Sequence, residues 1–158
     1  MTTTDVLIIG AGPSGAIAAA LLMARGHRVI VLEKQRFPRF SIGESLLPHC
    51  MQFIEAANMI QPLVDAGYQH KNGAVFLRSG NTVEFDFRDK LSPGWGTTYQ
   101  VVRADFDHLL AREAERQGAD VRYEQEILAC EFPDGRARVQ ARTAAGEAVP
   151  LDASKPGR

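Results

Sequence analysis

The glycine-rich run Gly10-Ala11-Gly12-Pro13-Ser14-Gly15 constrains the fold of this chain more than any other feature. It directly follows the apolar run 5–9, whose composition is typical of a buried parallel strand. Pro13 suits the first turn of a helix, and the Ala- and Leu-rich stretch 14–25 continues that helix. A second apolar run, 28–32, completes a βαβ unit of about the 30 residues that such a unit requires.

Each glycine of this run has a physical role in a phosphate-binding turn. Gly10 permits the tight turn, Gly12 lets the backbone approach a pyrophosphate, and Gly15 lets the helix pack near the strand. Glu33 ends the second strand, where its carboxylate can accept hydrogen bonds from a ribose diol. A glycine-rich turn without a ligand is the alternative, but the strands, loop, helix and acidic residue all agree with a dinucleotide site. The residues predicted to bind it are Gly10, Gly12, Pro13, Ser14, Gly15 and Glu33.

The chain departs from a simple nucleotide-binding fold after Glu33. Residues 34–40 read as an irregular connection, because they combine basic residues, two Phe and Pro38. Further elements are predicted as a helix over 48–57, a half-exposed antiparallel hairpin over 75–77 and 83–87, a helix over 105–117, and strands over 121–123, 127–132, 138–142 and 149–151. Turns are predicted at 92–96, Asp134-Gly135 and Ala145-Gly146. An ordinary NAD domain would continue with βα units, so the inserted antiparallel segments favour FAD.

Composition sets the class of protein. A chain of 158 residues with 45% hydrophobic content is long enough for one globular domain. The formal charge of -1 gives no field that would recruit nucleic acid or an anionic membrane. No apolar run is long enough to span a bilayer and the N-terminus lacks a basic segment, so we expect a soluble cytoplasmic protein. Cys50 and Cys130 lack the spacing of a metal site, and no metal is expected.

Three segments resemble one known family. They are Ile42-Gly43-Glu44-Ser45-Leu46-Leu47-Pro48, Lys71-Asn72-Gly73-Ala74-Val75-Phe76 and Gln100-Val101-Val102-Arg103-Ala104-Asp105-Phe106-Asp107. With the glycine loop, they resemble the flavin-dependent halogenases and the halogenase-like FAD oxidoreductases, which have the para-hydroxybenzoate-hydroxylase-like fold. The resemblance covers nearly all of residues 5–132. It implies an α/β fold: a Rossmann-like FAD-binding domain with inserted antiparallel β segments.

The resemblance also implies further contacts with FAD. Arg39 is expected to pair with the pyrophosphate, and Gly43 to leave backbone room beside the ring system. Arg103 resembles an FAD-contacting arginine, with Gln100 a weaker candidate, and a backbone group near Ile127 is expected to meet the adenine. The alternative for either arginine is an ordinary solvated cation. The cofactor-binding residues added in this way are Lys34, Arg39, Gly43, Arg103 and Ile127.

Lys71 is the catalytic candidate. The resemblance implies that its ammonium group meets the oxidised halide, either as a haloamine or as a hydrogen-bond donor, and the alternative is a solvated lysine at a strand end. His70 is interpreted as a turn residue. Glu44 is either a polar neighbour of flavin or halide or a carboxylate at a helix N-terminus. Trp95 and Tyr99 either line a pocket or fill the interior.

The sequence also departs from the family pattern. It lacks a Trp-x-Trp-x-Ile-Pro segment, and the run 151–154 resembles an Asp-Ala-Ser-Gly motif in which Lys155 replaces the glycine. We therefore expect residues 1–158 to be a partial, truncated FAD-binding domain without the substrate domain. The parent is expected to be an enzyme that uses reduced FAD, O2 and halide to halogenate a small-molecule substrate, with a separate flavin reductase as partner. The alternatives are an FAD-dependent hydroxylase or alkene reductase, and an inactive fragment or nucleotide-binding module.

Overall fold

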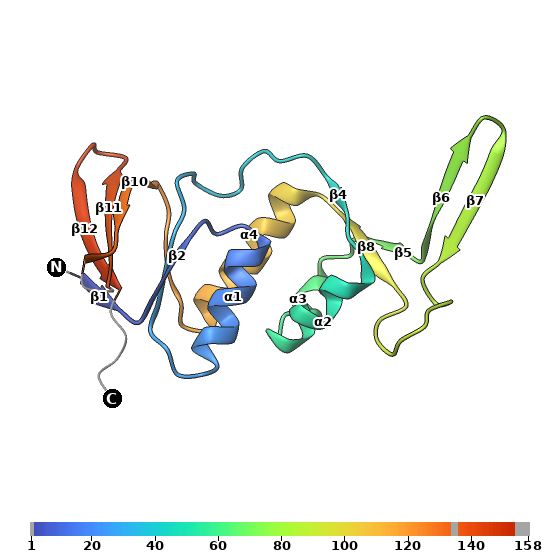
Figure 1. Ribbon diagram of the computed structural model, residues 1–158, viewed down its shortest axis with the longest axis horizontal. Helices are drawn as coiled ribbons and strands as arrows, with labels where there is room; N and C mark the ends of the chain where they lie inside the picture. Colours follow the sequence, from blue (N-terminus) through green and yellow to red (C-terminus); the bar gives the residue numbers. More distant parts are fainter. Residues whose placement is uncertain (1, 134–135, 154–158) are drawn as a thin grey trace. The chain divides into compact units, whose positions relative to one another are not determined.

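The computed structural model describes residues 2–133 and 136–153 of the chain (Figure 1). It divides into two compact units: unit 1 takes in residues 1–39 and 107–158, and unit 2 takes in residues 40–106. Unit 2 is therefore a continuous segment inserted into the sequence of unit 1. The length and composition suggested one domain, whereas the structure contains these two compact units.

Unit 1 is built on a parallel sheet. Its strands are β2 (Val6–Ile9), β3 (Val29–Leu32) and β9 (Asp120–Arg122), in that order. All four residues of β3 are buried, because the central strand is covered on both faces. Side chains alternate along a strand, so Ile30 and Leu32 face one covering layer while Val29 and Val31 face the other. The predicted βαβ unit is confirmed.

The first covering layer of unit 1 is an antiparallel sheet with one parallel edge strand. Its strands are β1 (Thr2–Thr4), β12 (Ala148–Ala153), β11 (Ala137–Thr143) and β10 (Gln125–Glu131), in that order. Ile30 and Leu32 pack with Val139, Ala141 and Leu151 of this sheet into one buried cluster. The meander β10–β12 was predicted. Strand β1 was not, because three threonines carry no apolar pattern and the partner strand β12 lies at the far end of the sequence.

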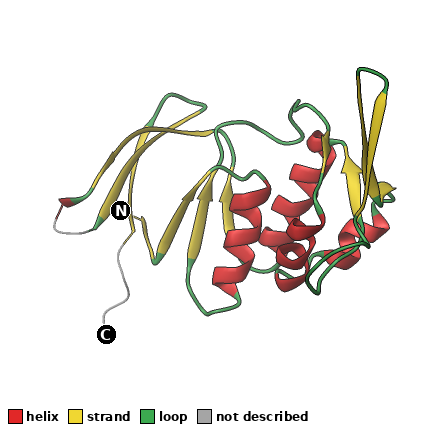
Figure 2. Ribbon diagram, turned by 45° about the vertical axis from the view of Figure 1, so that its right-hand side comes forward, coloured by secondary structure: helices red, strands yellow, loops and turns green. Residues whose placement is uncertain are grey.

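The second covering layer of unit 1 is helical. Helix α1 (Pro13–Met23) buries Ala16, Ala19 and Ala20, small residues that let it lie close to β3. Within unit 1, Figure 2 shows helix α1 on one side of the parallel strands and the antiparallel sheet on the other. Helix α4 (Arg103–Arg116) reaches unit 1 from Asp107 onward. No helix among residues 2–133 and 136–153 is long and apolar enough to cross a membrane.

Unit 2 contains two short helices and a three-stranded antiparallel sheet. The helices are α2 (Pro48–Ala56) and α3 (Ile60–Asp65), and the strands are β4 (Glu44–Ser45), β8 (Thr98–Val101) and β5 (Gln69–Lys71), in that order. Its buried side chains include Met51, Ile54, Met59 and Leu63. Helix α2 was predicted, whereas α3 and these strands were not. His70 was wrongly assigned to a turn: it lies in β5 opposite Tyr99.

A separate hairpin completes unit 2. Strands β6 (Gly73–Arg78) and β7 (Asn81–Asp86) pair only with each other among the described residues. The hairpin was predicted, but its burial was overestimated. Five of its large apolar side chains are 53–74% exposed: Val75, Phe76, Leu77, Val83 and Phe85.

The predicted irregular segments agree with the structure where it describes them. Residues 34–40 contain no helix or strand, and residues 92–96 are irregular with several bends. Gly146 donates its N–H to the carbonyl of Thr143 and closes the turn between β11 and β12. The turn predicted at Asp134-Gly135, and Ser154 and Lys155 of the C-terminal run, lie outside the described residues.

We predict that Gly15→Ala destabilises unit 1. A Cβ atom on Gly15 would overlap the carbonyl oxygen of Gly10 and press on the side chain of Ile8, so backbone must shift. Overpacking of this kind costs about 1–3 kcal/mol, and a backbone clash belongs at the upper end. Urea unfolding measures the change. Gly12→Ala is the matched control, because its Cβ would meet only the guanidinium of Arg39 at 3.9 Å; equal losses in the two variants would contradict the prediction.

A second prediction concerns Tyr123, whose hydroxyl is buried and has no hydrogen-bond partner among the described residues. Burial, and secondarily the charges of Glu115 and Glu33, raise the pKa of Tyr123 from 10.0 to about 12. Between these values the unfolded chain loses the phenolic proton while the folded chain keeps it, so stability falls as pH rises. Tyr123→Phe should remove that slope and leave stability at neutral pH equal or higher. Thermal unfolding at neutral and alkaline pH tests this, and identical slopes for both proteins would contradict it.

Candidate functional site

The glycine loop lies at the carboxyl end of the parallel sheet in unit 1. Gly10 has φ +96°, a left-handed conformation that favours glycine, and its N–H bonds to the carbonyl of Leu32 at 2.7 Å. Gly12 precedes helix α1, whose first turn has no side-chain cap and no acidic residue. The N-terminal N–H groups of α1 are thus available to an anion and carry the positive end of the helix dipole.

Glu33 braces this loop from the end of β3. Its side chain is buried, and its Oε2 accepts the N–H of Ala11 at 3.0 Å while Oε1 accepts the N–H of Gln35 at 2.9 Å. A carboxylate has about four lone-pair sites, so each oxygen can accept one more hydrogen bond. The bracing role was missed from the sequence, because a carboxylate 22 positions from Ala11 gives no local signal.

A cleft of about 340 Å³ opens beside Glu33 within unit 1. It is lined by Ile9, Gly10, Leu32, Glu33, Lys34, Gln125, Glu126 and Ile127. The cleft brings together Gly10, Glu33, Lys34 and Ile127, four residues predicted to bind the cofactor. Apolar walls with a buried carboxylate suit a nucleoside, whose base is flat and whose ribose hydroxyls donate hydrogen bonds.

Arg39 supplies positive charge beside Gly12 of the loop. Its Nη2 is 3.1 Å from Oδ2 of Asp107 and lies near the place where a Cβ on Gly12 would stand. Its Cζ is 4.9 Å from the centre of the Phe37 ring. Asp107 is fully buried. Sequence reasoning missed Asp107, although a signal exists: a carboxylate at this position falls on the apolar face of α4 formed by Leu110, Ala111 and Ala114.

In unit 2, Arg103 and Gly43 meet the strand pair β4 and β8. Arg103, the first residue of α4, pairs with Oε1 of Glu44 at 2.9 Å. Gly43 runs so close to β8 that a Cβ atom would lie 3.2 Å from the carbonyl of Val101. Glu44 is in strand β4, and the first turn of α2 contains no acidic residue, so the helix-terminus interpretation of Glu44 is wrong.

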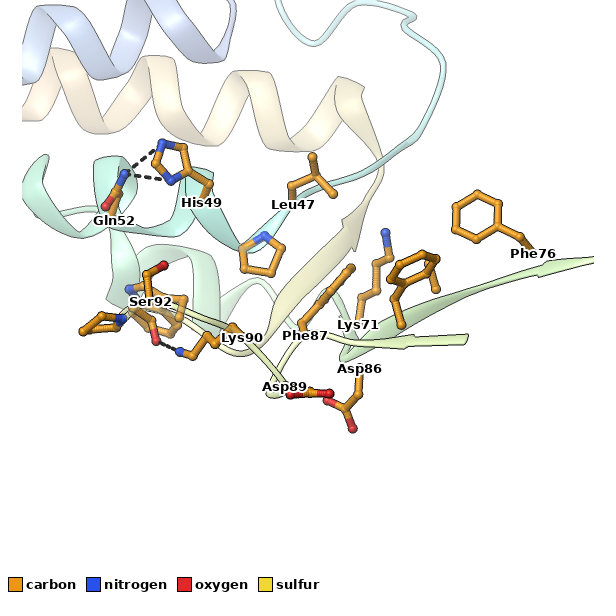
Figure 3. Close-up of a pocket in the computed structure, with 16 residues that line it drawn as sticks. Leu47, His49, Gln52, Lys71, Phe76, Asp86, Phe87, Asp89, Lys90 and Ser92 are labelled. Carbon is orange, nitrogen blue, oxygen red and sulfur yellow. Dashed lines mark hydrogen bonds between the residues drawn. The ribbon is translucent and has the colours of Figure 1, made fainter. Parts of the chain in front are cut away.

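Lys71 lies in the wall of a larger pocket in unit 2, of about 620 Å³. Aromatic and other apolar side chains dominate the lining, including Leu47, Pro48, Phe76, Phe85, Phe87 and Trp95. In Figure 3 the ammonium group of Lys71 points into the space between Leu47, Phe76 and Phe87, with Nζ 5.1 Å from the centre of the Phe87 ring. Charged side chains near an apolar wall are the usual anchors of a small-molecule site.

Two polar groups of this pocket, the carboxylate of Asp86 and the indole N–H of Trp95, are held by neighbouring side chains. Hydrogen bonds from Arg88 lower the pKa of Asp86 to about 2, so this carboxylate stays ionised. Trp95 lines the pocket and donates its indole N–H to Glu55 at 3.0 Å. Tyr99 is buried, and its ring is tilted by 44° to that of His70 with ring centres 4.5 Å apart. The sequence had left the two roles of Trp95 and Tyr99 open, and they differ.

The structure thus assembles the predicted residues in two groups. Unit 1 contains Gly10, Gly12, Pro13, Ser14, Gly15, Glu33, Lys34, Arg39 and Ile127; unit 2 contains Gly43, Lys71 and Arg103. Pro13 and Ser14 occupy the first turn of α1. Among the described residues no cluster of His, Cys, Asp or Glu could hold a metal ion. The donor set of unit 1 fits the ADP half of FAD: an uncapped helix N-terminus, an adjacent guanidinium and a buried carboxylate with unused lone pairs.

Comparisons with known proteins agree with this donor set. The model of the FAD binding domain family matches residues 3–153. A flavin-dependent halogenase from Armillaria mellea is 38% identical over 120 residues, which are 75% of this chain and 24% of the relative. A solved flavoprotein/dehydrogenase from Cytophaga hutchinsonii is 42% identical with a TM-score of 0.91, covering 95% of this chain and 37% of that one. A myxobacterial chondrochloren halogenase is 34% identical with a TM-score of 0.88, covering 97% and 36%.

The chain spans about a quarter of the length of the curated relatives it matches. Its similarity to flavin-dependent halogenases, expected from the Ile42–Pro48 segment and the segment after Lys71, is confirmed. The Rossmann-like α/β fold is confirmed by the parallel sheet and by the solved relatives. The chain therefore belongs to the FAD binding domain family, and FAD is its cofactor.

Proposed function

We propose that this chain is the FAD-binding portion of a flavin-dependent halogenase-like oxidoreductase, which uses reduced FAD, O2 and halide to halogenate a small organic substrate. The observation that carries the proposal is the ammonium group of Lys71, directed into an aromatic-walled pocket of unit 2. Curated relatives named as halogenases over most of this chain support it. A cytoplasmic location and a separate flavin reductase are part of the same proposal.

In unit 1, we assign the ADP half of FAD to the glycine loop and the cleft beside it. The N–H groups at the start of α1 and the guanidinium of Arg39 would bind the pyrophosphate, since both present donors to an anion. Glu33 would accept hydrogen bonds from the ribose, and the backbone near Ile127 would border the adenine. Bound and reduced, FAD supplies the electrons that activate O2.

In unit 2, we assign a donor role to Lys71. An ammonium group has three N–H donors and one positive charge, so it can hold and polarise an electronegative halogen species beside an aromatic ring. The aromatic walls of the pocket offer flat surfaces to an apolar substrate. Lys71 would thereby orient the electrophile towards the ring that is to be substituted.

A second candidate retains FAD and changes the reaction to hydroxylation or alkene reduction. It is favoured by the solved flavoprotein/dehydrogenase, which is 42% identical to this chain and so more similar in sequence than the solved chondrochloren halogenase. Under this alternative the aromatic pocket still binds an organic substrate. Lys71 then has no halide to meet and serves only as a positive wall group.

The ADP assignment predicts the effect of Glu33→Gln. The amide can accept at only one of its two terminal atoms, so it loses the bond from either Ala11 or Gln35, and with it the lone pair that this atom offers to the ribose. We expect ADP affinity, measured by calorimetric titration of this chain, to fall about tenfold or more. Glu147→Gln is the matched control, because that carboxylate is exposed in the turn between β11 and β12 and should leave affinity unchanged. Equal affinities for the Glu33 variant and the control would refute the assignment.

The role of Lys71 predicts the effect of Lys71→Met in the full-length protein. Methionine retains an apolar stem but removes the donor, so the rate of brominated product should fall about a hundredfold or more while FAD binding persists. Arg78→Met, which removes an exposed cation of the hairpin outside the pocket lining, should retain the wild-type rate.

Product analysis by mass spectrometry, with and without bromide, separates the two candidates. Halogenation predicts a bromide-dependent product that requires Lys71. An oxidised or reduced product that forms without bromide and at the same rate in Lys71→Met would establish the second candidate.

A further inference from the structure

We infer that Asp107 is a positioning residue: it fixes the guanidinium group of Arg39 so that this group can bind the pyrophosphate of FAD. The inference rests on the ADP site proposed above. Asp107 is fully buried and lies 3.1 Å from Arg39. It occupies the apolar face of α4 with Leu110, Ala111 and Ala114, each fully buried. A buried carboxylate loses hydration that only a close cation or hydrogen bonds can offset, and replacement by apolar residues is often neutral or stabilising. Stability alone therefore does not account for a carboxylate here.

The contacts of Arg39 indicate what the Asp107 carboxylate does. Asp107 contacts Nη2 of the guanidinium group, whose central carbon lies 4.9 Å from the centre of the Phe37 ring. The same Nη2 atom lies beside Gly12, at the N-terminus of α1, where the anion is expected. A guanidinium group has five N–H donors in a fixed fork, so a carboxylate can hold one edge while other donors face a phosphate. A fixed fork loses less conformational entropy on binding than a mobile side chain does.

The position of the pair in the chain adds a second consequence. Arg39 is the last residue of unit 1 before the chain enters unit 2, and Asp107 is the first residue of unit 1 after it returns. The ion pair therefore joins the two residues that flank the inserted segment 40–106. A phosphate bound by Arg39 would contact a guanidinium group that already links the two chain segments bordering residues 40–106. Nucleotide binding should therefore stabilise that link.

The test compares ADP with adenosine, two probes that differ in the pyrophosphate. Each is titrated into the 158-residue chain by calorimetry for wild type, Arg39→Gln, Asp107→Asn, Asp107→Glu and the Arg39→Gln/Asp107→Asn double variant. Asp107→Asn keeps the shape and one acceptor but removes the charge.

We expect Asp107→Asn to lower the affinity for ADP about tenfold and the affinity for adenosine less than twofold. The double variant should bind ADP no more weakly than Arg39→Gln alone, and Asp107→Glu should recover part of the affinity. Asp105→Asn, an exposed carboxylate two residues earlier in α4, is the control and should match wild type.

The outcomes separate this inference from the proposed function. Equal losses of ADP and adenosine affinity in Asp107→Asn, or additive losses in the double variant, would show a structural role only and overturn the inference. If Glu33→Gln weakens ADP while the Arg39 and Asp107 variants do not, the proposed ADP site stands and the inference fails. If folded wild type binds no ADP, both fail. Should Asp107→Asn not fold, Arg39→Gln and Asp107→Glu decide. Wild-type ADP affinity in either variant overturns the inference. An ADP-specific loss in both, smaller in Asp107→Glu than in Arg39→Gln, supports it.

Discussion

The proposed nucleotide site depends on the hydrogen bonds that the carboxylate of Glu33 accepts. By accepting the N–H of Ala11 it ties the glycine loop to the end of β3, and by accepting the N–H of Gln35 it fixes the chain that leaves the same strand. These bonds anchor the loop to the end of β3, a strand whose four residues are all buried. A ligand at Glu33 would meet a preorganised acceptor, with the backbone bonds already made.

The loop works with this anchor because two of its glycines meet different constraints. Gly15 is required by packing, since a side chain there would collide with the carbonyl of Gly10. Gly12 has room for a methyl group apart from the nearby guanidinium of Arg39, so the fold does not require glycine there. The reason that we propose for Gly12 is the ligand, because a phosphate bound at the start of α1 would have to approach this backbone closely. Fold and function thus act on neighbouring positions of one short motif.

Sequence reasoning predicted what local patterns determine. The run of β2, α1 and β3 follows from two apolar strands, a glycine loop and an Ala-rich helix, all close in the sequence. Strands β4, β5 and β8 escaped prediction because they are two to four residues long and paired by contacts far apart in the sequence. The ion pair of Arg39 with Asp107 was missed for the same reason: only the assembled fold brings the loop and α4 together.

The hairpin shows a different limit of pattern reading. Phe76, Val83 and Phe85 share one face of β6 and β7, because Phe76 lies opposite Val83 and side chains alternate along each strand. Alternation predicts that such a face is covered, yet these residues are exposed. Phe76 and Phe85 also line the pocket that contains Lys71, and their rings meet edge to face with centres 5.8 Å apart. An apolar face that binds a ligand has the same sequence pattern as one that packs in a core. The two can be told apart only by whether other elements of the fold cover the face.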